Sequence, residues 1–489
     1  MLKFLQDETL RERFMRTAML ILCLAVFLIV PLRIIAHGYL PIDDALRHSA
    51  HAVDGRDWGE VILMSPEFRP ETDGHPGWHR FLRFVHQHTN WSPDRLVYFS
   101  VALAFFTFTV GGLLAFGNPP AWFMACALMS IVEPAVFARL SLGRPFFFSM
   151  AALVVMLCLW TRPRPVRWWL EAALGVAVFT PAIVMYSSAW YLWAIPLLPL
   201  MVCRRWRSLL LATAALAIAI ATATLVNGWY NTLFVPLMGL KVSLLQSSTV
   251  TTNLVSELQP SGGPYLSLVV VMLFLTAKCV RGAKLRAEIF QVDFCLILLT
   301  WTMGLFVGRF WSEWGLPAMT VWMSRQILDS MQLKLSGLSR RGDTIGLMGL
   351  AAGVLYLGLT ADIGGRYTQA LRNPLLIAPF EDFAFELPAE GGVLYSPNMQ
   401  LFYAVYHRLP YVKFRFSTAF EPGIMPPEDL KVLRDHQAYG LLRDYKPWFE
   451  KMTSKDRIVL NSPMMPEWPE MEFKPFYGSW IGRKTAPSN

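Results

Sequence analysis

The sequence predicts an α-helical polytopic membrane protein with about 11 transmembrane helices, followed by a small C-terminal α/β domain outside the membrane. Hydrophobic residues make up 54% of its 489 residues and charged residues only 16%, against roughly 25% charged in ordinary globular proteins. Apolar runs recur as far as about residue 361, and Lys and Arg gather between them. This pattern excludes a cytosolic enzyme, a disordered scaffold and a secreted disulfide-stabilised module.

The first apolar run covers residues 14–36. As a helix it would rise roughly 35 Å, enough to cross a hydrocarbon core of about 30 Å. It is too long for a signal-peptide core and lacks a small-residue cleavage pattern before His37, so we expect a retained span. Further runs predicted to span the membrane are residues 96–117, 119–137, 145–160, 169–185, 187–203, 208–227, 265–280, 289–308, 313–333 and 344–361.

The distribution of positive charge predicts the orientation, because loops rich in Lys and Arg stay in the cytoplasm. A cytoplasmic N-terminus places on one side the basic clusters around residues 3–16, 162–167, 204–207, 278–286 and 334–341. The net charge of +9 is then largely a topology signal, and no nucleic-acid partner is expected. We therefore predict a transmembrane catalytic domain at 1–361, with outer loops at 37–95 and 228–264, and an outer domain at 362–489.

The C-terminal segment predicts a small α/β domain. Short apolar strands at residues 392–395 and 457–460 alternate with helical stretches at 399–407 and 428–436. The segment has neither a Gly-rich phosphate loop nor a Ser or Cys triad signature. A lid or an acceptor-binding domain is the expected role.

Two adjacent carboxylates, Asp43 and Asp44, follow the first apolar run within the motif Pro-Ile-Asp-Asp-Ala. Such a pair can supply a general base or hold a divalent cation such as Mg²⁺ or Mn²⁺. The alternative is structural: Asp43 caps a helix and Asp44 lies in its first turn. The rest of the loop carries Trp58, a Thr-Asp-Gly-His-Pro-Gly-Trp-His segment that includes His75, and an amphipathic stretch at 81–88.

This layout resembles the GT-C class of membrane glycosyltransferases, in which an acidic motif stands in the first outer loop and interfacial helices follow, often with a His-Pro turn. The Pro-x-Asp-Asp-Ala motif is similar to the Pro-Asp-Glu-Ala motifs of bacterial lipid-sugar transferases. The resemblance implies a bacterial inner-membrane enzyme whose C-terminal domain is periplasmic. It makes Asp43, with Asp44 as the alternative, the catalytic acid-base residue, and it includes His75 in the loop around the acceptor.

A second resemblance lies in the outer loop at 228–264. Residues 253–260, Asn-Leu-Val-Ser-Glu-Leu-Gln-Pro, look like the Ser-Val-Ser-Glu-His-Gln-Pro loop of oligosaccharyltransferase catalytic subunits. There the Glu helps to hold the acceptor, which implies that role for Glu257. The alternative is that Glu257 only anchors a turn before Pro260. The sequence lacks the Trp-Trp-Asp-Tyr-Gly motif of those subunits, so peptide Asn glycosylation is not expected.

Ionisable residues near the outer membrane edge complete the predicted site. Arg309 can grip phosphate oxygens bidentately, and in related transferases an Arg at this edge binds the carrier phosphate. The alternative is an ion pair between Arg309 and Glu313 at i,i+4 spacing. Arg144 is a second candidate for phosphate binding. Glu133 either lines the acceptor site or pairs with a neighbouring Arg.

Together these features predict an inverting hexosyl- or pentosyltransferase that moves a sugar from a polyprenyl-phosphate donor to a lipid, glycan or protein acceptor. No cofactor is expected beyond a divalent cation at Asp43 and Asp44. A lipid-linked glycan flippase or transporter is the first alternative, although paired repeats and midplane charges are typical of transporters. An O-antigen-type polymerase or ligase is the second, although its main outer loop would come late in the chain.

Overall fold

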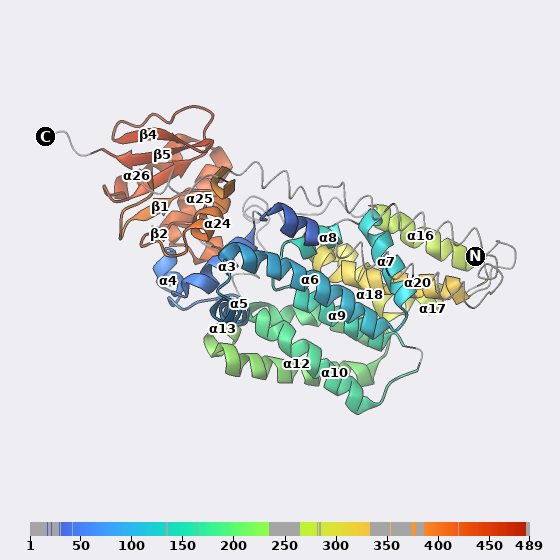
Figure 1. Cartoon of the computed structure of the whole chain (residues 1–489). Helices are drawn as coiled ribbons and strands as arrows, with labels where there is room; N and C mark the ends of the chain where they lie inside the picture. The colour runs from blue at the N-terminus through green and yellow to red at the C-terminus, as the bar shows by residue number, and fades with distance from the viewer. Residues whose placement is uncertain are drawn as a thin grey trace, which may run out of the picture. The chain divides into compact units, whose positions relative to one another are not determined.

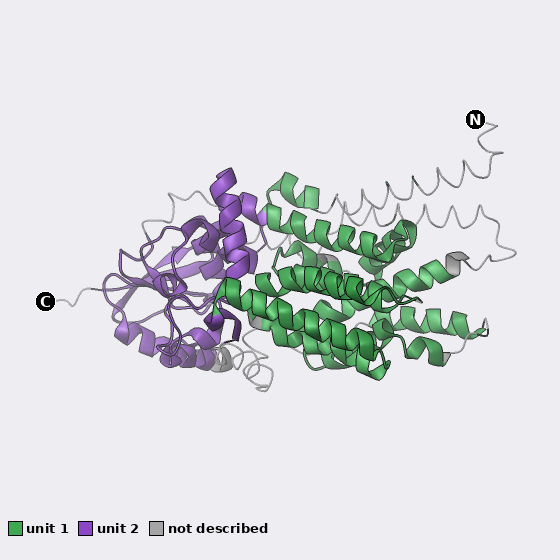
Figure 2. Ribbon diagram, turned by 90° about the horizontal axis from the view of Figure 1, so that it is seen from below, with its two compact units in different colours: residues 1–39, 98–228, 257–365 green, residues 40–97, 229–256, 366–489 purple. Residues whose placement is uncertain are grey.

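The computed structural model describes residues 17, 21, 29, 31–41, 43–133, 135–162, 164–233, 265–280, 282, 285–332, 353, 374–377, 386–418 and 420–485. The chain divides into two compact units, which Figure 2 shows in green and purple. Unit 1 contains residues 1–39, 98–228 and 257–365, and unit 2 contains residues 40–97, 229–256 and 366–489. This division differs from the predicted boundaries, because most of the first outer loop belongs with the C-terminal segment.

The elements that the structure describes in unit 1 are all helices (Figure 1). Its helices are α6 (Pro93–Phe116, from Tyr98 on), α7 (Pro119–Val132), α8 (Ala135–Ser141), α9 (Phe147–Trp160), α10 (Trp168–Met185), η1 (Ser187–Trp193), α11 (Ala194–Val202), α12 (Trp206–Asn227), α16 (Tyr265–Val280), α17 (Leu285–Ile289), α18 (Val292–Gly304), α19 (Gly308–Phe310), the π-helical turn η3 (Trp311–Gly315) and α20 (Leu316–Gln332).

Three of these helices, α6, α10 and α12, are long and apolar enough to cross a membrane. Shorter apolar helices of 10–17 residues include α7, α9, α16 and α18. The prediction of a membrane protein is thus supported by three helices. Most of the predicted span at 14–36 and all but residue 353 of that at 344–361 lie outside the described residues, and the count of eleven stays a prediction.

The contact between α6 and α7 shows how local sequence sets the packing of unit 1. Asn118 caps α7 by accepting a hydrogen bond from the Ala121 amide at 3.1 Å, and Pro119 occupies the first turn, where its missing amide hydrogen costs nothing. The Trp122 indole then donates to the Thr109 carbonyl of α6 at 3.1 Å. Gly112 makes room for that ring, because a Cβ there would lie 1.9 Å from Trp122 Cζ2.

A buried polar network joins α17, α18 and α20 in the same unit. Asp293, which is fully buried, accepts from Arg325 Nε at 2.8 Å and from Arg325 Nη2 at 3.1 Å. Glu288 accepts from Trp322 Nε1 at 2.9 Å and from Gln326 Nε2 at 2.6 Å. Buried charges require such partners, and the network was not predicted from the sequence.

Unit 2 contains a five-stranded mixed sheet with strand order β2-β1-β3-β5-β4. Strands β1 (Val393–Tyr395), β2 (Arg415–Phe416) and β3 (Arg457–Leu460) are parallel, and β5 (Ser479–Lys484) runs antiparallel to both β3 and β4 (Met471–Phe476). Tyr477 and Gly478 both have positive φ, as the two-residue turn of a tight hairpin requires. The predicted α/β character of this segment is confirmed.

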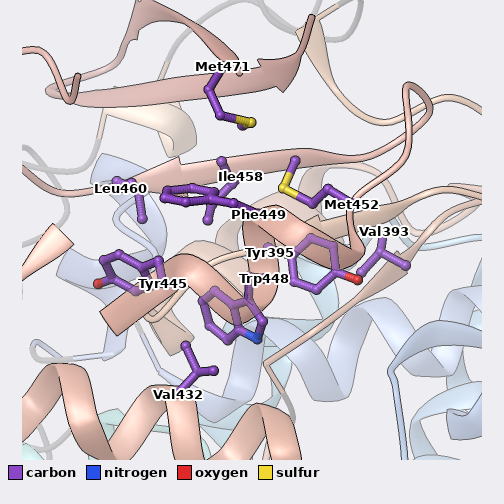
Figure 3. Close-up of a cluster of buried hydrophobic side chains, with 10 residues drawn as sticks. All are labelled: Val393, Tyr395, Val432, Tyr445, Trp448, Phe449, Met452, Ile458, Leu460 and Met471. Carbon is purple, nitrogen blue, oxygen red and sulfur yellow. The ribbon is translucent and has the colours of Figure 1, made fainter. Parts of the chain in front are cut away.

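The helices of unit 2 are α3 (Asp44–Asp54), α4 (Trp58–Val61), α5 (Pro76–Thr89), α13 (Trp229–Leu233), α23 (Pro374–Ile377), α24 (Met399–Arg408), η7 (Pro422–Ile424), α25 (Pro427–Tyr439), η8 (Leu442–Tyr445) and α26 (Lys446–Lys451). Figure 3 shows a buried core that α25, η8 and α26 form with the sheet, with Trp448 and Ile458 among its ten side chains.

The first-loop segment is hydrogen-bonded to the C-terminal segment within unit 2. The Leu63 amide donates to the Phe416 carbonyl, and the Ser65 amide to the Ile424 carbonyl, each at 2.8 Å. The Tyr406 hydroxyl donates to Asp54 at 2.8 Å. These bonds link residues more than 350 positions apart, so the predicted first loop and the C-terminal domain form one compact body.

Candidate functional site

The two carboxylates predicted as catalytic lie at the start of α3. Asp43 caps the helix, with Oδ1 accepting from the Asp44 amide at 2.7 Å. Asp44, in the first turn, accepts from Arg47 Nε at 3.0 Å and lies within hydrogen-bonding reach of the Tyr403 hydroxyl. Asp43 and Arg47 are buried. The structural alternative is therefore present: Asp43 caps α3, and Asp44 lies in its first turn.

His75 lies at the beginning of α5, the next long helix of the loop. Its backbone amide donates to Asp73 Oδ1 at 2.8 Å, and Pro76 follows in the first turn of the helix. The His75 ring packs edge-on against His48 of α3, with the ring centroids 4.9 Å apart. The predicted loop residue thus belongs to a polar cluster between α3 and α5.

The centre of this cluster is a chain of short hydrogen bonds. His79 Nδ1 lies 2.6 Å from Asp73 Oδ2, and His79 Nε2 lies 2.6 Å from His48 Nδ1. The Asp73 backbone amide donates to the Asn231 side chain at 3.0 Å. All three members of the chain are buried, so their geometry is held by packing as well as by polar contacts.

The protonation states in the cluster follow from its surroundings. Burial alone would raise the pKa of Asp73, but the charge and hydrogen bond of His79 outweigh it and lower the pKa well below its usual range. Burial lowers the pKa of His51 well below its usual value, and the neighbouring His79 lowers it further. At neutral pH the cluster therefore holds an ionised Asp73 and a neutral His51.

His51 occupies the next turn of α3 after His48. Its ring stacks on the buried Trp58 at 4.2 Å, with an angle of 11° between the planes. Among the residues that the structure describes, one group of potential metal ligands has its donor atoms within 4.8 Å of one another, namely His51, Asp73 and His79. Neither Asp43 nor Asp44, the predicted metal ligands, is part of that group.

A second polar chain connects α3, α24 and the start of α6. His407 Nδ1 lies 3.0 Å from Ser49 Oγ, and His407 Nε2 lies 2.7 Å from Asp94 Oδ1. Ser49 is fully buried and donates its hydroxyl to the Leu46 carbonyl at 2.8 Å, whereas the Asp94 side chain is 46% exposed. A catalytic serine needs an accessible hydroxyl activated by its base. This Ser-His-Asp chain is therefore not a catalytic triad, and its hydrogen bonds connect α3, α24 and the start of α6.

Arg309, the predicted phosphate ligand, lies in unit 1 at the turn before α20. Its Nε donates to Glu313 Oε1 at 2.5 Å and its Nη2 donates to the Tyr186 hydroxyl at 2.8 Å. Arg139 donates to the same carboxylate oxygen. The i,i+4 ion pair considered from the sequence is present, and the guanidinium groups of Arg309 and Arg139 share one buried carboxylate.

The remaining predicted residues have separate environments. Glu133 ends α7 and accepts a hydrogen bond from the Ser267 hydroxyl at 3.1 Å. Arg144 lies half-buried in the turn between α8 and α9, directly after Gly143. Glu257 lies outside the described residues. The structure thus brings Asp43, Asp44 and His75 into unit 2, while Glu133, Arg144 and Arg309 belong to unit 1.

Of the four clustered histidines, only His75 was predicted as a site residue from the sequence. A usable signal was present, because His48 and His51 are separated by three positions and His75 and His79 by four. Those spacings place each pair on one face of a helix. Spacing alone does not show that these faces of α3 and α5 contact each other.

None of the protein-family models and none of the curated proteins compared with this sequence matches it.

Proposed function

We propose that the protein is an inverting glycosyltransferase with a GT-C-like layout of about eleven spans, which transfers a sugar from a polyprenyl-phosphate carrier to an acceptor at the periplasmic face. The observation that carries this proposal is the buried carboxylate of Asp43 at the start of α3, directly after the first apolar run. A carboxylate at this place in the chain can act as a general base.

Two guanidinium groups that contact one carboxylate in unit 1 support binding of a phosphate. Arg309 and Arg139 both pair with Glu313. Guanidinium groups bind phosphate oxygens through paired N–H donors. The charge that develops on a departing polyprenyl phosphate would be stabilised in this way.

In the proposed reaction, Asp43 takes the proton of the acceptor hydroxyl as its oxygen attacks the anomeric carbon. The new glycosidic C–O bond forms while the bond from the anomeric carbon to the phosphate oxygen breaks. The bonding pair leaves with the polyprenyl phosphate. Attack opposite the leaving group inverts the anomeric centre. The acceptor is a lipid, a glycan or a protein.

The decisive test is the variant Asp43→Asn. Asn is as good a helix cap as Asp, so the substitution removes the basic carboxylate and keeps the cap. We expect transfer to fall by about 10²–10⁴-fold, the usual contribution of a general base, with an unchanged melting temperature. The assay uses the full chain in nanodiscs with synthetic polyprenyl-phosphate hexoses and pentoses, and it measures released polyprenyl phosphate. Full activity in this variant would show that Asp43 is not the base.

Asp44→Asn is the matched comparison. It removes the partner of the buried Arg47, so it should destabilise the protein by about 3 kcal/mol, as when a buried ion pair loses one member. The two variants therefore distinguish a catalytic role for Asp43 from a structural role for Asp44. Loss of activity in Asp44→Asn with unchanged stability would instead assign the base to Asp44.

Arg309→Ala tests the donor site. The variant leaves Glu313 paired with Arg139, so we expect folding to be retained and the carrier to bind more weakly, with KM for the donor raised at least tenfold. Binding is measured with a fluorescent polyprenyl phosphate. Unchanged carrier affinity in Arg309→Ala would leave Arg309 as a purely structural residue.

A further inference from the structure

Four of the nine histidines of the chain gather between α3 and α5 of unit 2. They are His48, His51, His75 and His79, each of them buried. The His51 and His79 rings are 4.5 Å apart, and those of His48 and His79 are 4.8 Å apart. The catalytic scheme above uses none of these imidazoles, so their concentration around one carboxylate needs a separate explanation.

One histidine of the cluster has an unsatisfied polar atom. His51 is 5% exposed, and its buried Nδ1 has no hydrogen-bond partner within the described part of the chain. Leaving a buried polar atom without a partner costs about 1–3 kcal/mol. Its ring is held by stacking on Trp58, so the orientation of this imidazole is set by packing.

The donor atoms of His51, Asp73 and His79 lie within 4.8 Å of one another. Ligands at about 2.1 Å from Zn²⁺ stand roughly 3.4 Å apart in a tetrahedron, so small side-chain rotations close the remaining distance. Two imidazoles and a carboxylate form the ligand set of open zinc sites, in which a fourth position takes water or a substrate atom. Mg²⁺ prefers oxygen ligands and is disfavoured here.

The groups around these three side chains suit a metal site. Ligating histidines donate their second ring N–H to a neighbouring acceptor, and His79 Nε2 lies 2.6 Å from His48 Nδ1. The other oxygen of Asp73 is oriented by the His75 amide at 2.8 Å. Arg47 and Arg83 act electrostatically on His51 and would oppose a cation, so the negative charge of Asp73 is essential to the site.

We propose that His51, Asp73 and His79 bind one divalent transition-metal ion, Zn²⁺, through the two imidazoles and the carboxylate. The ion replaces the proton shared by Asp73 and His79 Nδ1, and that proton is released to solvent. The site joins α3, α5 and the loop between them. It is distinct from the carboxylate pair Asp43 and Asp44, and its existence does not depend on the transferase activity.

The test uses the purified full chain in nanodiscs, stripped of metal with a chelator and titrated with Zn²⁺ against a chromophoric indicator. We expect about one Zn²⁺ per chain, no competition by excess Mg²⁺, and a rise in melting temperature with free Zn²⁺, as mass action requires. Co²⁺ should give the visible absorption of a four-coordinate site. A folded wild-type chain that binds no Zn²⁺ would overturn the proposal.

Two ligand variants and one control locate the ion. His51→Gln should weaken Zn²⁺ binding at least tenfold and remain folded, because His51 Nδ1 has no hydrogen bond to lose among the described residues. Asp73→Asn should abolish binding. His88→Gln, an exposed position on the same helix α5, should bind as the wild type does. Wild-type affinity in His51→Gln, or loss of binding in His88→Gln, would place the ion elsewhere.

Asp43→Asn separates this inference from the proposed function. That variant should bind Zn²⁺ normally while it loses sugar transfer. If the wild-type chain binds Zn²⁺ through the His51 site but transfers no sugar, the metal site is supported and the glycosyltransferase proposal is wrong. If it transfers sugar but binds no Zn²⁺, the glycosyltransferase is supported and the metal-site proposal is wrong.

Discussion

At the scale of single residues, the candidate site consists of buried polar side chains that hold one another and the helices in place. Asp43 caps α3, and Asp73 orients His79 by a 2.6 Å hydrogen bond. The sequence identified Asp43, Asp44 and His75 because their types and their position after an apolar run are unusual. It did not identify His51 or Asp73, because burial and partners are properties of the folded chain.

Asp94 provides a residue-level prediction about pH. The hydrogen bond from His407 lowers the pKa of Asp94, although partial burial raises it. A carboxyl whose folded pKa is depressed contributes stability above its unfolded pKa, about 3.9, and that contribution is lost as the pH falls through the folded value. We therefore expect Asp94→Asn to be less stable than the wild type at neutral pH, with a difference that shrinks below about pH 4.

The measurement is chemical or thermal unfolding of the full chain in detergent across this pH range. Asp57→Asn is the control, because Asp57 is exposed and its side chain makes no capping bond to α4. A difference between Asp94→Asn and the wild type that stays constant down to the lowest pH would contradict the assigned role of the His407 bond.

At the scale of elements, several helices and strands follow directly from local sequence. The strands at 393–395 and 457–460 and the helices at 399–408 and 427–439 agree with the expected α/β pattern, because apolar periodicity and turn residues act over short distances. Helices long and apolar enough to cross a membrane coincide with the predicted spans at 96–117, 169–185 and 208–227. The predicted span at 313–333 begins inside a π-helical turn at 311–315, and α20 begins at Leu316. Hydropathy does not distinguish a π-helical turn from an α-helix.

The packing of α6 on α7 gives a prediction at this scale. Gly112→Ala should lower the stability of the protein by about 1–3 kcal/mol, the usual cost of overpacking, because the new Cβ would lie 1.9 Å from the Trp122 ring. Gly111→Ala is the control, since its Cβ would lie 4.0 Å from Val155 Cγ2, and Ala favours the helix by about 1 kcal/mol. Thermal unfolding in detergent measures both variants, and equal effects would rule out the steric explanation.

At the scale of the whole molecule, the three long apolar helices indicate a membrane protein, and the basic clusters predict a cytoplasmic N-terminus. We expect the chain to stay in the membrane fraction after alkaline extraction. A phosphatase reporter fused after residue 485 should be active, as in the periplasm, and one fused in the basic loop near residue 205 should be inactive. The opposite activities would invert the topology and remove the proposed periplasmic reaction.

The compact units were not predictable from the order of elements. Hydropathy assigned residues 37–95 to a loop of the membrane domain, yet residues 40–97 form one unit with residues 366–489. Hydrogen bonds such as Leu63 to Phe416 and Tyr406 to Asp54 create that unit. Pairings across more than 350 positions have no signature in a single sequence.

The sequence by itself determined that this chain is apolar, mostly helical and directed to a membrane, and that Asp43 and Asp44 begin a helix after the first apolar run. Those features depend on composition and on neighbours within a few turns of helix. Only the tertiary structure decided that His51, Asp73 and His79 share one buried cluster and that Arg139 joins Arg309 on Glu313. The reason is physical: charge compensation and burial depend on contacts between residues that the chain brings together from distant segments.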